Sequence, residues 1–400
     1  MLSFEEAQKR ILDLARRLGE EQVPLARALG RVTARDVRAP ADAPAFDSSM
    51  MDGYAVRAGD VSAGAEPMPV VGESRAGAPA PRLVPGSACR IFTGAPMPEG
   101  ADAVIMQEEA ERETDRVRFR RVPPLGAHVR KRGEDLRSGA VALPAGTRLG
   151  PAELAMLASI DCASVEVGRV PRVVVLPTGD ELRAPGTSSR AGSVQIPESN
   201  TPALAAMASS VGAIVEARQP IGDDPAVTNE AVARALEACD VLVTIGGVSV
   251  GDHDVVRPAL EACGVAIDFW KVAIKPGKPL AVGRRGEVIV LGLPGNPVSA
   301  MVTFALFGLP LLRALQGDAS PWPRASRGRL AAPVTRKPGR LEFARATLDE
   351  SGVVTLLPQQ ASGAIIGLCR ADALACLPPD AESLPAGAEV AIYTLAELGI

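Results

Sequence analysis

The stretch Val288-Ile-Val-Leu-Gly-Leu-Pro-Gly-Asn-Pro-Val-Ser299 joins an apolar run to a rigid turn and a helix start. The apolar run predicts a buried strand, and Pro297 favours the first turn of a helix. A second rigid turn, Lys275-Pro-Gly-Lys-Pro279, precedes the same strand. Because proline fixes φ and glycine permits unusual backbone conformations, Lys275 and Lys278 are expected on a stiff loop. Such cations beside free helix amides suit an oxyanion, and two ordinary turns with solvated lysines are the alternative.

Strands and helices alternate around this stretch, between Pro171 and Gln316. Alternation of this kind predicts an open parallel sheet covered by helices. Ligands of such sheets bind in the loops at the carboxyl ends of the strands. We therefore expect the loops 178–181 and 246–254 to meet the two rigid turns at one edge. The expected strands are 172–176, 214–218, 241–245 and 288–291, and the expected helices are 201–211, 225–238, 255–263 and one from 297.

The loop Gly246-Gly-Val-Ser-Val-Gly251 resembles a phosphate cradle, because glycines let consecutive N–H groups face an anion. The alternative is a glycine turn needed only for a close passage from strand to helix. Asp252 and Asp254 follow the loop, and carboxylates beside a phosphate cradle commonly hold Mg²⁺. Asp180 and Glu181 are expected either to serve likewise or to cap a helix.

The flanking regions read differently. Residues 4–18 have apolar positions at helical spacing and predict an amphipathic helix. Short apolar runs broken by Gly and Pro predict a small β-rich domain from about 61 to 124, and strand-like runs predict another at the end of the chain. The aperiodic segment 46–57 marks a candidate site, whereas the charged segment 130–135 suits either a site or a solvated turn.

Composition excludes several classes of function. With 43 basic and 47 acidic residues, a net charge of -4 and no basic tract, the chain does not suit nucleic acid. The opening residues lack the order of a signal peptide, and we expect no apolar run that approaches the length of a membrane span, so a cytoplasmic protein is expected. Six cysteines without a C-x-x-C pair, and only two histidines, argue against a zinc site and a disulfide framework. Catalysis is therefore expected to rest on carboxylates, lysines and loops.

Eight segments, in order, resemble the molybdopterin molybdenumtransferase family, whose relatives include the E domain of gephyrin. They cover nearly the whole chain: FDSSMMDGYAVR at 46–57, RIFTGAPMPEGADAVIMQE at 90–108, RKRGED at 130–135, TGDEL at 178–182, GGVSVGDHD at 246–254, KPGKP at 275–279, GLPGNPVSA at 292–300 and GRLEFARA at 339–346.

The resemblance implies a multidomain α/β fold and an elongated homodimer with the site between subunits. The α/β domain would be a three-layer, parallel-sheet, molybdopterin-binding domain. The implied divisions are a discontinuous N-terminal domain at 1–45 and 125–168, an inserted β-rich domain at 46–124, the α/β domain at 169–318 and a C-terminal β-barrel-like domain at 325–400.

The activity implied is the last step of molybdenum cofactor biosynthesis. A Mg²⁺-dependent transferase would insert molybdate into adenylylated molybdopterin and release AMP. The catalytic residues implied are Asp52, Thr93, Asp135, Glu181, Asp254, Lys275 and Lys278. Those for Mg²⁺ are Asp180, Glu181, Asp252 and Asp254. Those for substrate or molybdate are Gly246, Gly247, Ser249, Gly251, Pro279, Pro294, Asn296, Ser299, Arg340 or Arg345, and Ser362.

Two departures from the family pattern keep an alternative open. The family usually has I-Y-D-S-N where this chain has Ile196-Pro-Glu-Ser-Asn200, and Val255 replaces the usual tyrosine after Asp254. Loss of an aromatic platform weakens packing against a flat ring. The alternative is a non-catalytic paralogue that binds and delivers molybdopterin or finished cofactor. A molybdopterin adenylyltransferase and acceptor molybdoenzymes are the further partners expected, and a scaffold of the gephyrin kind is the third hypothesis.

Overall fold

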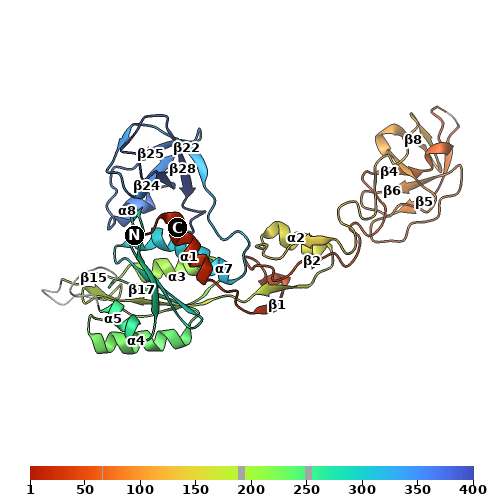
Figure 1. Ribbon diagram of the computed structural model, residues 1–400. Helices are drawn as coiled ribbons and strands as arrows, with labels where there is room; N and C mark the ends of the chain where they lie inside the picture. The colour runs from red at the N-terminus through yellow and green to blue at the C-terminus, as the bar shows by residue number, and fades with distance from the viewer. Residues whose placement is uncertain (65, 188–193, 248–254) are drawn as a thin grey trace.

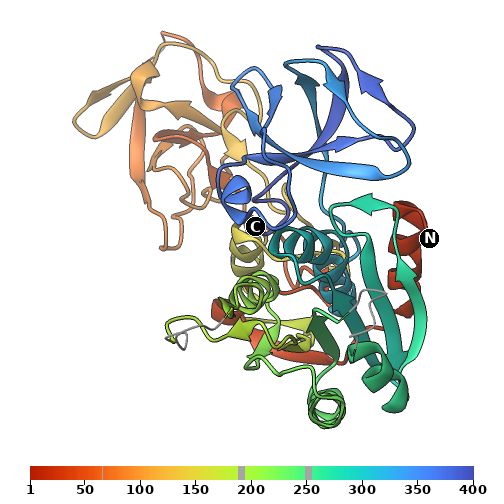
Figure 2. The ribbon, with the colours of Figure 1, turned by 90° about the vertical axis from the view of Figure 1, so that its left-hand side faces the viewer.

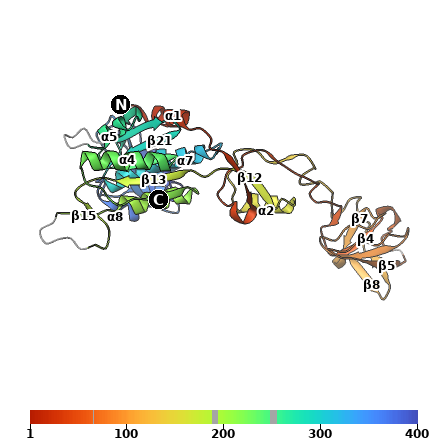
Figure 3. The same cartoon turned by 90° about the horizontal axis from the view of Figure 1, so that it is seen from below.

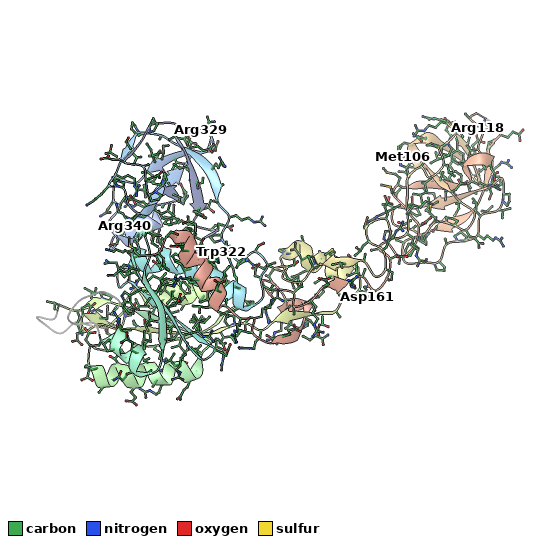
Figure 4. The ribbon with its side chains drawn as sticks, viewed as in Figure 1. Met106, Arg118, Asp161, Trp322, Arg329 and Arg340 are labelled. Atoms are coloured by element: carbon green, nitrogen blue, oxygen red, sulfur yellow. The ribbon has the colours of Figure 1, made fainter. Side chains whose placement is uncertain are left out.

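The computed structural model describes residues 1–64, 66–187, 194–247 and 255–400. Figure 1 shows an elongated molecule. An α/β unit and a C-terminal unit form a body at one end, a middle unit follows, and a distal unit lies at the other end. Figure 3 shows the same separation from below. Asp161 therefore lies on the middle unit, Met106 and Arg118 on the distal unit, and Arg329 and Arg340 on the C-terminal unit (Figure 4).

The α/β unit is built on a six-stranded sheet with the order β16-β13-β17-β21-β20-β18. Four neighbouring strands are parallel, as the sequence predicts, whereas β20 and β18 join antiparallel to extend the sheet. The sheet is therefore mixed, and the loops that are expected to form the site follow its parallel strands. The strands are β13 (Arg172–Pro177), β16 (Ile214–Ala217), β17 (Val241–Ile245), β18 (Ala266–Lys271), β20 (Pro279–Arg285) and β21 (Val288–Leu293).

Helices cover both faces of this sheet and make three layers. On one face the apolar core includes buried residues of α1 (Phe4–Leu14), α3 (Asn200–Ser210) and a long helix from Pro297. On the other face α4 (Pro225–Ala238) and α5 (Val256–Ala262) pack on Val174, Leu242 and Val290. Two short parallel strands, β14 (Leu182–Arg183) and β15 (Ile196–Pro197), lie beside the carboxyl end of β13.

The long helix corrects one expectation from the sequence. Pro297–Leu315 is long and apolar enough to cross a membrane, although no such run was expected, but 83% of it is buried inside the protein. It consists of α6 (Pro297–Thr303), a π-helical turn η4 (Phe304–Gly308) and α7 (Leu309–Leu315). Pro310 has no N–H to donate to the preceding turn, which suits a π-helical irregularity there. It is a core helix of the α/β unit.

The C-terminal unit is a barrel closed by pairing of β24 with β26. Figure 2 shows it, in blue, stacked on the α/β unit. Strand β19 (Ile274–Lys275) leaves the α/β unit and pairs in parallel with β24, so the two units share a sheet. The barrel elements are β22 (Ser326–Leu330), β24 (Leu341–Leu348), β25 (Val353–Leu356), β26 (Ala373–Leu377) and β28 (Glu389–Thr394), with β23 (Val334–Thr335), β27 (Ser383–Leu384) and α8 (Ile365–Cys369).

The chain leaves the body after α1, forms the middle and distal units, and returns to the body after β12 (Ser164–Gly168). These two passages are the two crossings of the chain. The middle unit contains β1 (Glu20–Pro24) paired with β12, η1 (Leu25–Arg27), β2 (Val37–Arg38) paired with β11 (Val141–Leu143), and α2 (Pro151–Ser159). β3 (Ser48–Ser49) pairs with β10 (Val129–Arg130) on the way out. The distal unit is a six-stranded sheet of β4 (Gly53–Val56), β5 (Met68–Ser74), β6 (Ala88–Ile91), β7 (Ala103–Met106), β8 (Ala110–Glu113) and β9 (Arg116–Phe119), with η2 (Ala58–Asp60) and η3 (Gln107–Glu109).

Candidate functional site

A pocket of about 330 Å³ lies where β13, β17 and β21 end. Glu181, Gly246 and Asn296 line it from the three loops that follow these strands. The loops touch closely: Gly246 has φ +86, and a Cβ there would lie 2.7 Å from the carbonyl oxygen of Thr178. Glycine is therefore required at 246 on both conformational and steric grounds. The predicted meeting of these loops at one sheet edge is confirmed for the part of the chain described.

Glu198 explains how the altered segment 196–200 still builds the wall of the pocket. Its buried carboxylate accepts hydrogen bonds from the backbone N–H groups of Asn200 (2.7 Å) and Thr201 (3.0 Å) at the start of α3. The Asn200 side chain then donates to the carbonyl oxygen of Gly295, 2.8 Å away. An acid at 198 thus caps the helix and fixes Asn200 against the Gly295 turn, although it is a glutamate.

Lys275 is held from the C-terminal unit by a buried carboxylate. Its Nζ lies 2.7 Å from Oε1 of Glu342 on β24, while Nε of Arg336 lies 3.0 Å from Oε2. Burial alone would raise the pKa of Glu342, but the hydrogen bonds from Lys275 and Arg336 hold that pKa below its usual range. Lys275 is therefore an ordered cation, whereas Lys278 is exposed.

The loop that carries these lysines fits tightly on the long helix. Gly277 has φ +106, and a Cβ there would lie 2.2 Å from Oγ1 of Thr303 in α6. Thr303 is fully buried, so it has no room to move aside. The turn thus needs glycine, and the expectation of a stiff loop agrees with this contact.

Ser362 lies in a loop of the C-terminal unit that contacts the start of α6. Its carbonyl oxygen accepts from the N–H of Val298, at 3.1 Å. The guanidinium of Arg345 on β24 supports this loop by donating to the carbonyl oxygens of Gln359 (2.7 Å) and Ala361 (3.1 Å). Arg345 is only 2% exposed, and its Nε and Nη1 have no partner among the described residues. Burial lowers the pKa of this guanidinium.

The two acids after β13 point in different directions. Oδ1 of Asp180 accepts from the N–H of Asp223 at 3.1 Å, so this carboxylate closes a neighbouring turn. Glu181 faces the pocket, and no side-chain hydrogen bond or ion pair of its carboxylate occurs within the described ranges. Those ranges contain no cluster of three metal-binding side chains. The predicted residues Ser249, Gly251, Asp252 and Asp254 lie outside the described residues.

The remaining predicted site residues of the body differ in how exposed their side chains are. Pro294 and Ser299 are buried beside the turn and in the first turn of α6, whereas Arg340 is half-buried at the edge of the barrel. Gly247 adopts φ +58, so its amide follows that of Gly246 in a left-handed conformation suited to an anion cradle. Pro279 opens β20 directly after Lys278.

Asp52 and Thr93 form a second cluster, in the distal unit. Oδ1 of Asp52 accepts from both the backbone N–H and the hydroxyl of Thr93, each at 2.8 Å. These two bonds hold the pKa of Asp52 below its usual range. The carboxylate is thus kept ionised on an exposed surface, with Met50 and Met51 exposed beside it. Asp52 and Thr93 are brought together in the distal unit, which lies well away from the α/β and C-terminal units (Figure 1).

The charged segment 130–135 is a network of ion pairs on the connection to the distal unit. Arg130 pairs with Asp135, and Lys131 Nζ lies 2.8 Å from Oδ2 of Asp47. Arg132 Nε lies 2.6 Å from Oδ2 of Asp42. All these cations are largely exposed, so the segment joins the two crossings of the chain, and Asp135 is tied to Arg130.

Sequence reasoning did not single out Glu342, Arg336 or Asn200 as site residues. The sequence signal for Glu342 was an acid within a largely apolar, strand-like run. The structure shows that residues 341–346 are almost all buried. A buried carboxylate requires a partner, so this pattern indicates an ion pair. The signal for Asn200 was its place at a helix start, two residues after an acid.

Three family models together match most of the chain. The MoeA N-terminal region (domain I and II) matches residues 2–160, a probable molybdopterin binding domain matches 174–314, and the MoeA C-terminal region (domain IV) matches 327–395.

Relatives match over nearly the full length. Molybdopterin molybdenumtransferase 2 of Mycobacterium tuberculosis is 37% identical, covering 99% of this chain and 100% of the relative. Molybdopterin molybdenumtransferase of Haemophilus influenzae is 38% identical over 88% of each chain. The crystal structure of a molybdopterin biosynthesis moeA protein from Pyrococcus horikoshii OT3 has a TM-score of 0.86 at 30% identity, covering 98% of this chain and 100% of that one.

Proposed function

This chain belongs to the molybdopterin molybdenumtransferase family, and we propose that it inserts molybdate into adenylylated molybdopterin with release of AMP. The observation that carries the proposal is the junction of the α/β and C-terminal units. There the pocket lined by Glu181 and Asn296 adjoins the loop of Ser362 at the start of α6, and the turn that carries Lys275 packs on Thr303 of the same helix. A transferase that inserts molybdenum is what the family and its relatives support, and the release of AMP is part of the proposal.

The pocket suits the organic part of the substrate. Its volume of about 330 Å³ lies in the range of small-molecule sites. The amides of Gly246 and Gly247 are available to phosphate oxygens in our proposal, as glycine-rich loops after strands commonly are. Glu198 supports this use of the pocket, because it keeps the start of α3 capped where the family has an aspartate. Pro197 is then a tolerated variation.

Molybdate suits the cationic edge of the junction. A tetrahedral dianion is recognised by cations together with hydroxyl donors. We assign direct contacts to Lys278, Ser299, Ser362 and the half-buried Arg340. Lys275 supplies an ordered charge, because Glu342 holds it. Arg345 supports the Ser362 loop from beneath, since its Nη2 is already committed to two carbonyl oxygens.

Mg²⁺ fits part of the predicted ligand set. Carboxylate oxygens are the ligands this ion prefers, and the Glu181 carboxylate is free to provide one, whereas Asp180 is engaged with Asp223. We assign Mg²⁺ to Glu181 with Asp252 and Asp254. When bound, the ion would neutralise charge on the diphosphate linkage, as in phosphoryl transfer. Glu181 then orients that linkage toward the lysines.

Asp52 and Thr93 enter the site from a second copy of the chain in this proposal. The elongated shape keeps the distal unit away from the body of its own chain (Figures 1 and 3). A twofold-symmetric homodimer with the two copies antiparallel places each distal unit on its partner's body. We propose a cytoplasmic homodimer that receives substrate from a molybdopterin adenylyltransferase and delivers product to molybdoenzymes.

The test is a measurement of AMP release and protein-bound molybdenum with adenylylated molybdopterin, Mg²⁺ and molybdate, against a control without molybdate. AMP release that depends on molybdate, with matching molybdenum incorporation, is the expected result. Tight binding of the adenylylated pterin without AMP release would instead identify a carrier and overturn the transferase proposal. Asp52→Ala and Lys278→Ala are expected to abolish insertion while the fold stays intact.

A further inference from the structure

A second pocket, of about 440 Å³, lies at the opposite end of the same sheet. It is near the amino ends of β13, β17 and β21, because Arg172, Asp240 and Val288 line it. β13 spans six residues, so this end lies about 20 Å from the carboxyl ends of the strands. The pocket is therefore separate from the site described above.

Arginines surround this pocket, although the chain as a whole is acidic with a net charge of -4. Five guanidinium groups line it, and three carboxylates, those of Glu237, Asp240 and Glu287, leave an excess of two positive charges. The arginines come from three separate segments of the chain: Arg16 and Arg17, Arg169 and Arg172, and Arg284.

The ion pairs in the pocket are unequal. Arg169 binds Asp240 through two bonds of 2.9 and 3.0 Å, so that carboxylate is already satisfied. Arg172 reaches Asp240 only at 3.5 Å, and Arg16 reaches the exposed Glu287 only at 3.4 Å. Arg17 has no carboxylate partner among the described residues, and its Nη2 lies 3.4 Å from the carbonyl oxygen of Gly317. The guanidinium groups of Arg16, Arg17 and Arg172 can thus bind an anion with the loss of only weak contacts.

Part of the pocket lining is apolar, and its three leucines are called the floor below. Leu14, Leu236 and Leu315 line it from α1, α4 and α7. A bare inorganic anion would leave this floor uncovered. A ligand with an anionic head and an apolar or aromatic body would use both features, because guanidinium groups bind phosphate in a fork and apolar surface favours the body.

We propose that this pocket is a binding site for an organic phosphate, with its phosphate on Arg16, Arg17 and Arg172 and its body on the leucine floor. The occupant would touch both crossings of the chain, since Arg16 and Arg17 lie on the first and Arg172 begins the strand after the second. Both crossings connect the body to the middle and distal units (Figure 1). The site is independent of the proposed transferase reaction.

The test is calorimetric titration of the full chain with phenyl phosphate and, separately, with inorganic phosphate. We expect phenyl phosphate to bind more tightly, and Arg17→Gln to weaken it about fivefold, with a larger loss in Arg16→Gln/Arg17→Gln. Arg234→Gln, on the exposed face of α4 beside Glu230, is the matched control and should bind normally. Lys278→Ala should also bind normally, because it alters only the other end of the sheet.

Three results would overturn the proposal. One is the absence of phenyl phosphate binding at millimolar concentration. Another is binding that Lys278→Ala abolishes and the arginine variants do not, which would place the phosphate at the carboxyl ends of the strands. The third is dissociation of an oligomer in Arg16→Gln/Arg17→Gln, seen by sedimentation, which would show that a second copy of the chain covers the pocket. Circular dichroism of each variant confirms that it is folded.

Discussion

Lys275 of the α/β unit and Glu342 of the C-terminal unit form an ion pair with Nζ and Oε1 2.7 Å apart. The same carboxylate binds Arg336, so one buried acid joins two cations from different parts of the chain. Lys275 and Glu342 are also register partners in the strand pairing that connects the two units. The position of a proposed molybdate-binding loop thus depends on an acid of the barrel.

Glu342→Gln should destabilise the junction by about 2–4 kcal/mol, because it leaves two cations facing each other without their shared carboxylate. Calorimetric unfolding at neutral pH measures this loss. Glu389→Gln is the matched control, since its pair with Arg327 is exposed and should contribute little. Equal destabilisation by the two variants would contradict the structural role of Glu342.

The same pair predicts a dependence on pH. The pKa of Glu342 is held below its ordinary value in the folded protein, so the unfolded chain binds a proton there first as the pH falls. Its contribution to stability is therefore present above the ordinary pKa of glutamate and is lost as the pH falls through the lower, folded pKa. Calorimetry from pH 7 downward should show a smaller acid-induced loss in Glu342→Gln than in wild type. Parallel curves would rule out this linkage.

Gly277→Ala should cost about 2–4 kcal/mol and weaken molybdate binding, because its Cβ would overlap the Thr303 hydroxyl in a positive-φ conformation. Gly339→Ala separates the two causes: its φ of +107 is nearly the same, but no atom lies within 4 Å of the added Cβ. That variant should show the backbone strain alone. Calorimetry gives both stabilities, and equal losses would mean that the contact with Thr303 is unimportant.

Glu198→Ala should lose about 1 kcal/mol of stability through the uncapped start of α3 and should also weaken binding of the adenylylated pterin, whereas Glu198→Asp should keep both. Glu153→Ala provides the control, because Glu153 accepts from the N–H of Gly150 at the start of α2 in the middle unit, away from the pocket. It should lose similar stability with unchanged pterin binding, measured by calorimetric titration. Unchanged pterin binding in Glu198→Ala would contradict the link through Asn200.

Much of the fold could be predicted because the parallel strands are short apolar runs bounded by Gly or Pro, as in Arg172–Pro177, which follows Pro171 and precedes Gly179. The antiparallel strands β18 and β20 could not, since their apolar residues alternate with Asp268 and end in Arg284 and Arg285. Their pairing is decided by the neighbouring strand β21 rather than by their own pattern.

The loops of the candidate site could be predicted from the sequence, but the residues that hold those loops in place could not. Lys275 and Gly246 lie in glycine- and proline-rich turns. Such turns can be recognised from the sequence, because glycine and proline interrupt helices and strands. Glu342 and Asn200 act through partners distant in the chain, Lys275 and Gly295, and spacing along the sequence carries no information about such pairs. The separation of Asp52 from the body likewise follows from the path of the two crossings, which no local pattern specifies.

Thr93→Val should raise the pKa of Asp52, because it removes the hydroxyl bond to Oδ1 and leaves only the bond from the backbone N–H. If an ionised Asp52 is needed for insertion, the acid limb of the activity profile should move to higher pH. Carbon-detected NMR titration of the Asp52 carboxyl measures the pKa directly. Thr93→Ser restores a hydroxyl and should return both readouts to the wild-type values, whereas an unaltered pKa in Thr93→Val would show that the backbone bond alone sets it.

Mixing Asp52→Ala with Lys278→Ala tests whether one site is shared by two copies. Each variant alone should be inactive, because every site in the proposed homodimer lacks one residue. After reassortment, half of the dimers are mixed and each has one complete site, so roughly a quarter of the wild-type activity should return. Recovery requires that Asp52 and Lys278 come from different copies, since a site formed within one chain would stay defective in every dimer. No recovery, in a sample that native mass spectrometry shows to have exchanged subunits, would place the distal unit on the body of its own chain and require a bend between the units.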